Sequence, residues 1–96
     1  MKALMIMRVK VTNPEHLKSY QDIAPSIIKK YQGKIIARGG EVITHEGPDE
    51  NRRLVIVEFP SPTKATEFYH SPEYQEAIIL RDGAADFEII SVECLE

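Results

Sequence analysis

The sequence lacks the features that mark secreted, metal-binding and membrane-spanning proteins. Only one of its 96 residues is a cysteine, Cys94, so no disulfide can form within the chain and a cytoplasmic location is expected. No run approaches the roughly 20 apolar residues of a membrane span, and the apolar start, residues 1–7, is too short for a secretory signal. The three histidines lie on separate predicted elements without metal-ligand spacing, so neither a metal nor a bound cofactor is expected.

Positive charge is also scarce. Twelve Lys and Arg residues stand against fifteen Asp and Glu, and the basic residues are scattered, which argues against a nucleic-acid partner. The pair Gly39-Gly40 is not followed by a predicted helix, so it does not resemble a phosphate-binding loop. The composition, 43% hydrophobic and 28% charged, is typical of one globular domain, here residues 1–96. No nucleic-acid or membrane partner is expected, and the candidate ligand is a small organic molecule.

What the chain does contain is a hydrophobic pattern that switches between strand and helix periods. Residues 3–11 alternate with a period of two, which predicts a strand. One face carries Ala3, Met5, Met7, Val9 and Val11, and the other carries Leu4, Ile6, Arg8 and Lys10. Asn13 and Pro14 form an N-cap followed by a first-turn proline. Apolar residues at helical spacing then continue as far as Gly33, where a helix end is expected. Pro25 lies inside this stretch and is expected to kink or split the helix.

The second half of the chain reads as two strands, two short helices and a last strand. A strand is predicted from Lys34 to Glu46 with a bulge at Gly39-Gly40, and another from Arg53 to Phe59. The remaining elements are two short helices beginning at Ser61-Pro62 and Ser71-Pro72, and a strand from Phe87 to Cys94. The order is β-α-β-β-α-β, which predicts a ferredoxin-like α+β fold with a four-stranded antiparallel sheet.

Two helical regions can cover only one face of such a sheet. If Arg38 lies opposite Glu58 on the neighbouring strand, the helices cover one apolar face, and a second face stays open. That open face would carry Ile36, Val42, Leu54, Ile56, Leu4 and Ile6 beside Arg38, Thr44 and Glu58. Large exposed apolar patches usually mark interfaces. The pattern therefore predicts a homodimer in which two sheets pack face to face.

The chain resembles the dimeric α+β barrel superfamily and, within it, the family called domain of unknown function 1330. The resemblance covers nearly the whole chain and is most specific at the Ser-Pro-Glu-Tyr-Gln segment, Ser71–Gln75. The other segments that carry it are Tyr31–Lys34, Arg38–Gly40, Glu46–Gly47, Val57–Ser61, Ala65, Phe68–Tyr69 and Arg81. One departure is the acidic hairpin Pro48–Asn51, where similar proteins often carry a tryptophan.

This resemblance implies a ferredoxin-like fold and a sheet-to-sheet dimer. It implies no particular activity, because similar proteins on the same fold include oxygenases, isomerases, haem-degrading enzymes and ligand-sensing domains.

Glu58 is the leading candidate for a catalytic residue. A carboxylate within an apolar strand is costly unless it is paired or functional. In one interpretation it is a general base or ligand anchor with a raised pKa. In the other it forms an ion pair with Arg38, with Arg8 or Lys10 as further neighbours. Arg38 is equally suited to holding a ligand carboxylate through two hydrogen bonds.

The other ligand-pocket candidates lie on the two Ser-Pro helices. Tyr69 and Tyr74 either present hydroxyls to a cleft or pack in the core. Ser71 is interpreted mainly as an N-cap. Arg81, near a helix C-terminus, either interacts with the helix dipole or reaches a ligand. Of two competing cavities, one between the facing sheets and one between the sheet and these helices, the second is the predicted binding site.

Two functions remain open at the level of sequence. One is a cofactor-independent enzyme of the oxygenase or isomerase type acting on a small anionic molecule, with Glu58 and Arg38 holding or deprotonating it. The other is a dimeric module that binds a small ligand without converting it.

Overall fold

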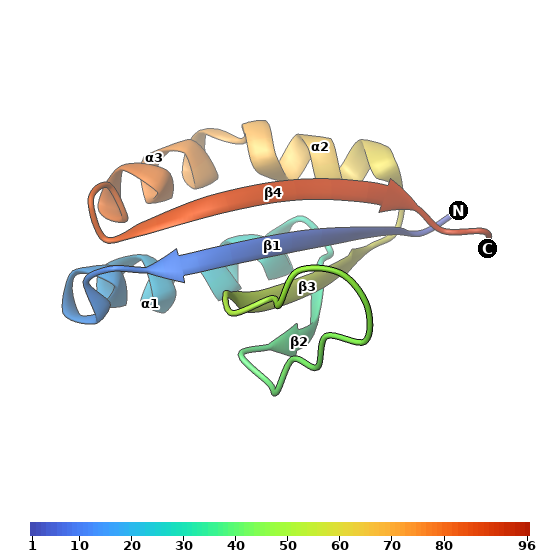
Figure 1. Cartoon of the computed structure of the whole chain (residues 1–96). Helices are drawn as coiled ribbons and strands as arrows, with labels where there is room; N and C mark the ends of the chain where they lie inside the picture. The colour runs from blue at the N-terminus through green and yellow to red at the C-terminus, as the bar shows by residue number, and fades with distance from the viewer.

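The computed structural model describes all 96 residues as a four-stranded antiparallel sheet with three helices against one face (Figure 1). The strands follow the order β2-β3-β1-β4 across the sheet. The elements are β1 (Ala3–Val11), α1 (Pro14–Lys30), β2 (Lys34–Arg38), β3 (Arg53–Phe59), α2 (Pro62–His70), α3 (Pro72–Leu80) and β4 (Ala85–Glu93). The predicted ferredoxin-like fold is confirmed. No helix is both long and apolar enough to cross a membrane.

The helices begin where the capping residues predict. The side chain of Asn13 accepts a hydrogen bond from the amide of His16, and Ser61 and Ser71 make the equivalent bonds at α2 and α3. A proline follows each of these caps, in the first turn of the helix. The helix α1 continues through Pro25 without interruption, so the predicted split does not occur.

The end of α1 brings the chain tightly back to the sheet. Gln32 adopts a left-handed φ of 66°, and the amide of Gly33 donates to the carbonyl of Ile28 at 2.8 Å. A side chain at Gly33 would lie 2.6 Å from Cγ2 of Ile28 and 2.8 Å from Cε1 of Phe59. Glycine is therefore required here by the close approach of helix and strand, while Gln32 takes the left-handed conformation.

The hydrophobic core lies between the helices and the inner face of the sheet. Alternate residues of β1 are buried, as the period of two predicts. Phe68 of α2 packs against Phe59 and Tyr74, with ring centroids 5.3 and 4.4 Å apart. The buried residues of the core cluster are Met5, Met7, Val9, Leu17, Tyr20, Ala24, Ile27, Ile28, Val57, Phe59, Ala65, Phe68, Tyr74, Ala77 and Ala84.

The strand β2 differs from its prediction in length and in the place of its irregularity. It ends at Arg38 rather than at Glu46, because the following residue, Gly39, takes a left-handed φ of 69°. The register shift between β2 and β3 falls between Ile35 and Ala37, not at Gly39-Gly40. One extra residue on a strand turns every later side chain to the other face.

The predicted pairing of Arg38 with Glu58 is therefore wrong. Arg38 lies opposite Val55 and is turned toward the helices. Glu58 stays on the open face, where its carboxylate forms an ion pair with Lys2 at 3.0 Å. The shift at the irregularity places the two charges on opposite faces of the sheet.

The connection from β2 to β3, residues 39–52, lies in front of the sheet in Figure 1, on the side away from α1. Glu50 anchors its end: its carboxylate accepts from Nε of Arg52 at 2.7 Å and lies 3.3 Å from Nε of Arg8. Arg52 also donates to Glu88 at 2.6 Å. Hydrogen bonding by Arg52 lowers the pKa of Glu50, which keeps this cluster ionised.

The rest of the open face is apolar and uncovered. Ile6 of β1 lies between Ile56 of β3 and Ile90 of β4, and Leu4 lies beside Val92. Ile90 and Val92 are each 52% exposed. The structure thus confirms that the helices leave one apolar sheet face without a partner within the chain.

Candidate functional site

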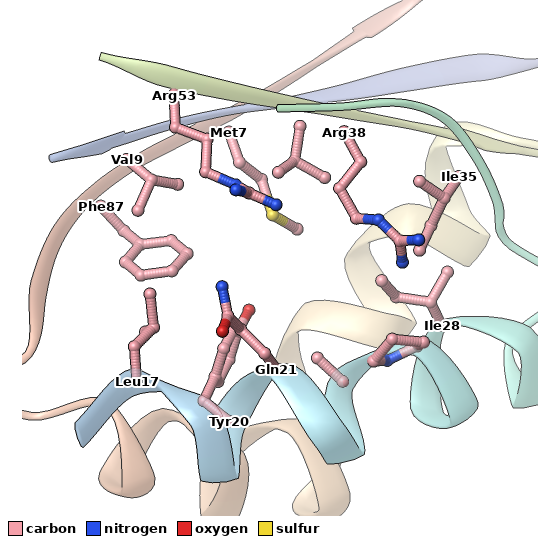
Figure 2. Close-up of a pocket in the computed structure, with 13 residues that line it drawn as sticks. Met7, Val9, Leu17, Tyr20, Gln21, Ile28, Ile35, Arg38, Arg53 and Phe87 are labelled. Atoms are coloured by element: carbon pink, nitrogen blue, oxygen red, sulfur yellow. The ribbon is translucent and has the colours of Figure 1, made fainter. Parts of the chain in front are cut away.

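A cavity of about 290 Å³ lies between α1 and the inner face of the sheet (Figure 2). The core side chains between the helix and the sheet do not fill this space completely. Nine of its thirteen lining residues are hydrophobic. The lining residues are Met7, Val9, Leu17, Tyr20, Gln21, Ala24, Pro25, Ile28, Ile35, Arg38, Arg53, Val55 and Phe87.

Three exposed polar residues, Gln21, Arg38 and Arg53, mark the mouth of this cavity. In Figure 2 the guanidinium groups of Arg38 and Arg53 extend from the sheet toward α1, and Gln21 rises toward them from the helix. Neither arginine takes part in any of the ion pairs of the molecule. Two unpaired positive charges therefore lie at the opening of an apolar cavity.

Local backbone geometry places both arginines there. The irregularity after Ile35 turns Arg38 inward, and Arg53 is the first residue of β3, in phase with inward-facing Val55. The guanidinium of Arg53 packs against Gly39, where a Cβ atom would lie 2.9 Å from its Cζ. The left-handed φ of Gly39 favours glycine here, and the absence of a side chain leaves room for the guanidinium beside it.

Pro25 leaves one backbone carbonyl of α1 without its helical hydrogen-bond donor at the mouth of the cavity. A proline has no amide hydrogen, so α1 lacks the hydrogen bond from residue 25 to the carbonyl of Gln21. Both residues line the cavity.

A pair of hydrogen-bonded tyrosines lies at the inner wall. The hydroxyl oxygens of Tyr20 and Tyr74 are 2.6 Å apart. Burial raises the pKa of both hydroxyls, and the neighbouring positive charge of Arg81 acts against that rise. Both tyrosines are therefore protonated at neutral pH. Tyr20 lines the cavity, whereas Tyr74 is completely buried behind it.

Arg81 lies behind the same wall. Its Cζ is 3.7 Å from the ring centroid of Phe87 and 5.3 Å from that of Tyr20, in cation–π geometry. Its Nε is buried and has no hydrogen-bond partner. Arg81 thus contacts two aromatic residues that line the cavity without lining it itself, and it borders a separate open hollow at the end of α3.

The other predicted site residues are dispersed. Ser71 is an N-cap whose hydroxyl accepts from the amide of Tyr74 at 3.1 Å and donates to the carbonyl of Phe68 at 2.7 Å. Tyr69 borders a smaller hollow of about 170 Å³ beside α2. Tyr74 is 0% exposed, so the open part of the predicted cleft between the sheet and these helices lies beside Tyr69 and His70 rather than beside Tyr74. Of the predicted candidates, Arg38 alone lines the apolar cavity.

Sequence reasoning missed Arg53, Gln21 and Tyr20. Arg53 lies two residues before inward-facing Val55, so the alternation along β3 predicts that it shares the face toward the helices. Tyr20 falls in the helical spacing of the apolar residues of α1 and belongs to the core, but it also borders the cavity. No sequence pattern distinguishes a core tyrosine from one beside an unfilled space.

The arrangement is suited to binding an anion with an apolar body. The thirteen lining residues include two arginines, a tyrosine and a glutamine, but no Asp, Glu, His or Cys. The cavity wall therefore offers hydrogen-bond donors and no evident general base. Elsewhere in the molecule, no three His, Cys, Asp or Glu side chains are gathered where they could hold a metal ion.

Solved structures with the same fold include proteins of unknown function and one enzyme. The RPA0582 protein of unknown function from Rhodopseudomonas palustris is 25% identical, with a TM-score of 0.76 over 99% of this chain and 83% of that one. SnoaB from Streptomyces nogalater, described as a cofactor-independent oxygenase, is 10% identical, with a TM-score of 0.69 over 99% of this chain and 94% of SnoaB.

A dimeric ferredoxin-like protein of unknown function from Jannaschia sp. CCS1 is 8% identical, with a TM-score of 0.74 over 98% of this chain and all of that one. No curated protein is significantly similar to the chain. A family profile described as domain of unknown function (DUF1330) matches residues 2–95. The chain therefore belongs to the DUF1330 family, as its sequence motifs predict.

Proposed function

We propose that this protein binds a small organic carboxylate with an apolar body in the cavity between α1 and the sheet. The observation that carries the proposal is the presence of two unpaired guanidinium groups, Arg38 and Arg53, at the mouth of an otherwise apolar cavity. A guanidinium matches a carboxylate through two parallel hydrogen bonds. The apolar body would contact Met7, Val9 and Phe87 beyond them.

In the proposed site, as in many small-molecule sites, affinity and selectivity come from different parts of the ligand. Apolar surface contributes about 25 cal/mol for each Å² removed from water, so the body of the ligand supplies most of the affinity. The arginines select the sign of the charge and fix the orientation. Because Arg38 and Arg53 are both exposed to solvent, each is expected to raise the binding affinity by a moderate factor only.

Turnover of the same ligand is the second candidate function. The observation that favours it is the protonated Tyr20–Tyr74 pair, which can donate to a ligand oxygen that gains negative charge. SnoaB, a cofactor-independent oxygenase, has a similar fold. The candidate base Glu58 lies on the opposite sheet face, and the cavity lining contains no replacement for it. Binding without conversion is therefore the function that the geometry supports best.

The proposed assembly is a homodimer formed through the open sheet face. Its support is the exposed apolar surface that includes Ile90 and Val92, together with the dimeric state described for similar proteins of Jannaschia sp. CCS1 and Bacteroides fragilis. In this arrangement the two ligand cavities lie on the outer sides of the dimer, because they open on the other face of each sheet.

Calorimetric titration with 2-naphthoate tests the binding proposal. We expect saturable binding, and a roughly fivefold to tenfold loss of affinity in Arg38→Gln and in Arg53→Gln, which corresponds to about 1–1.4 kcal/mol. Lys29→Gln, on the exposed side of α1 and outside the cavity lining, is the matched control, since it removes the same charge. Recovering the naphthoate unchanged after aerobic incubation would favour binding over turnover.

Absence of saturable binding would contradict the proposal. So would amide chemical-shift changes confined to the hollow around Tyr69 and His70, with α1 and β2 unaffected. An equal loss of affinity in Lys29→Gln would show that the arginines act only through net charge.

A further inference from the structure

The tyrosine pair has one more hydrogen than it uses. Each hydroxyl carries one hydrogen, and the bond between Tyr20 and Tyr74 engages only one of the two. Neither hydroxyl donates a hydrogen bond to a protein group outside the pair. Because both side chains are buried, a donor without an acceptor is costly here, and an acceptor from outside the chain would relieve that cost.

The nearby guanidinium cannot supply that acceptor. Arg81 lies beside both tyrosines, but a guanidinium has only donors. Its positive charge instead attracts the lone pairs of the hydroxyl oxygens and turns their hydrogens away from it. The spare hydrogen must therefore point toward a group other than Arg81.

Of the two tyrosines, only Tyr20 borders the cavity. Tyr74 is 0% exposed and is enclosed by Phe68, Tyr69 and Tyr20, with ring centroids 4.4 to 6.1 Å away. Tyr20 comes from α1 and lies among the labelled side chains of the cavity in Figure 2, across from the two guanidinium groups. Either hydroxyl can donate within the pair, but a spare hydrogen on enclosed Tyr74 would have no acceptor. The arrangement in which Tyr74 donates to Tyr20 is therefore favoured, and it leaves the hydrogen of Tyr20 free to be donated into the cavity.

We infer that the ligand carries a second polar group, a carbonyl oxygen remote from its carboxylate, which accepts a hydrogen bond from the Tyr20 hydroxyl. This inference rests on the proposed binding function and narrows the ligand class to keto acids with an apolar spacer. Arg38 and Arg53 hold the carboxylate at the exposed mouth, and Tyr20, only 6% exposed, meets the carbonyl in the interior.

The size of the cavity agrees with such a ligand. A volume of about 290 Å³ takes a molecule of roughly a dozen non-hydrogen atoms. An aromatic ring with a carboxylate at one end and an acyl group at the other has that size. The ring would lie among Met7, Val9 and Phe87.

Two ligands with the same number of non-hydrogen atoms test the inference: 4-acetylbenzoate, and 4-isopropylbenzoate, in which a methyl group takes the place of the carbonyl oxygen. We expect the wild-type protein to bind 4-acetylbenzoate at least fivefold more tightly. We also expect the infrared band of its ketone carbonyl to move to lower wavenumber on binding. The comparison is demanding, because the isopropyl compound is the more apolar of the two and would otherwise bind better.

Two variants separate donation by Tyr20 from a general effect on packing. Tyr20→Phe and Tyr74→Phe both remove the same hydrogen bond between the hydroxyls, but only Tyr20→Phe removes the group that faces the cavity. We expect Tyr20→Phe to lose the fivefold preference and the infrared shift, and Tyr74→Phe to keep both. If Tyr20→Phe does not fold, the position of the ketone band in the wild-type complex still shows whether the carbonyl accepts a hydrogen bond.

Equal binding of both benzoates with an unshifted ketone band would overturn this inference and leave carboxylate binding intact. Loss of the preference in both tyrosine variants would also overturn it, because packing would then be the cause. If neither benzoate binds, and 2-naphthoate also fails, the proposed function itself is wrong.

Discussion

At the scale of single residues, the Tyr20–Tyr74 pair joins the stability of the protein to its candidate site. Two hydroxyls on different helices share one hydrogen bond in the core, and burial raises the pKa of both. Their neutral forms are therefore favoured by the fold. This contribution to stability is present below the unfolded tyrosine pKa of about 10 and is lost as the pH rises through the folded values.

Alkaline titration followed at 295 nm, where tyrosinate absorbs, checks this prediction. We expect the absorbance of Tyr20 and Tyr74 to appear only together with loss of the circular dichroism signal, since ionisation requires the core to open. Tyr20→Phe should cost about 1–2 kcal/mol of unfolding free energy, because the Tyr74 hydroxyl loses its buried partner. Tyr69→Phe, whose hydroxyl makes no hydrogen bond in the structure, should cost less. Ionisation of all tyrosines in the intact fold near pH 10 would contradict the prediction.

Single residues are also where sequence reasoning reached its limit. The period of two in β3 correctly predicts that Val55, Val57 and Phe59 share the face toward the helices. The same period in β2 assigns Arg38 to the wrong face, because a single extra residue after Ile35 reverses the phase and leaves no mark in the composition. The sequence predicts the bulge at Gly39-Gly40, but the strand ends before Gly39, which takes a left-handed φ.

At the scale of elements, a polar cluster ties the end of α1 to the start of α3. The Lys30 ammonium forms an ion pair with Glu73, and the Tyr31 hydroxyl donates to the other oxygen of the same carboxylate at 3.1 Å. The hydrogen bond from Lys30 lowers the pKa of Glu73, and the same contact raises the pKa of Lys30. These contacts hold α1, and so one wall of the cavity, against α3.

The pH dependence of stability should report this cluster. Because the folded pKa of Glu73 is lowered, its contribution is present above the unfolded carboxyl pKa of about 4.3 and is lost as the pH falls through the folded value. Because the folded pKa of Lys30 is raised, its contribution is present below about pH 10.4 and is lost at higher pH. Chemical denaturation of Glu73→Gln between pH 3 and 6 should give a flatter acid slope than wild type.

Glu76→Gln is the matched control for this measurement. Glu76 lies on the same helix, is exposed and forms no ion pair, so its removal should leave the acid slope nearly unchanged. Identical slopes for the two variants would show that the cluster does not couple proton binding to folding.

Most elements could be predicted from sequence because residues at their ends determine where they begin. Asn13, Ser61 and Ser71 each cap a helix through their own side chain, and a proline follows each of them. The strand β2 could not be bounded in this way. Its predicted continuation through Val42 and Ile43 forms no strand in the structure, and whether such a segment pairs depends on the position of a neighbouring strand.

At the scale of the whole molecule, the sheet has one covered face and one bare face. Only 17 of 96 residues are buried, and all the helices pack on one side. The bare side carries Leu4, Ile6, Ile56, Ile90 and Val92 in one continuous patch across β3, β1 and β4. Stable interfaces remove roughly 800 Å² from each partner, which the face of a four-stranded sheet can supply.

The last prediction is that a charge placed on this bare face separates the proposed dimer. Light scattering at micromolar concentration should give about twice the 10.9 kDa mass of one chain for the wild type. Ile90→Asp should shift the mass toward 10.9 kDa, because an unpaired carboxylate in a dry interface is strongly unfavourable. Ile90 is a better choice than half-buried Ile56, since it is 52% exposed in the protomer and its replacement spares the core.

Ile79→Asp is the matched control: Ile79 is 71% exposed on α3, away from the sheet face, and should leave the mass at the dimer value. Because the cavity opens on the other side of the sheet, a folded Ile90→Asp monomer should still bind 2-naphthoate. A wild-type protein that is a well-folded monomer would exclude the dimer. A monomeric variant that no longer binds 2-naphthoate would instead show that dimer formation shapes the cavity.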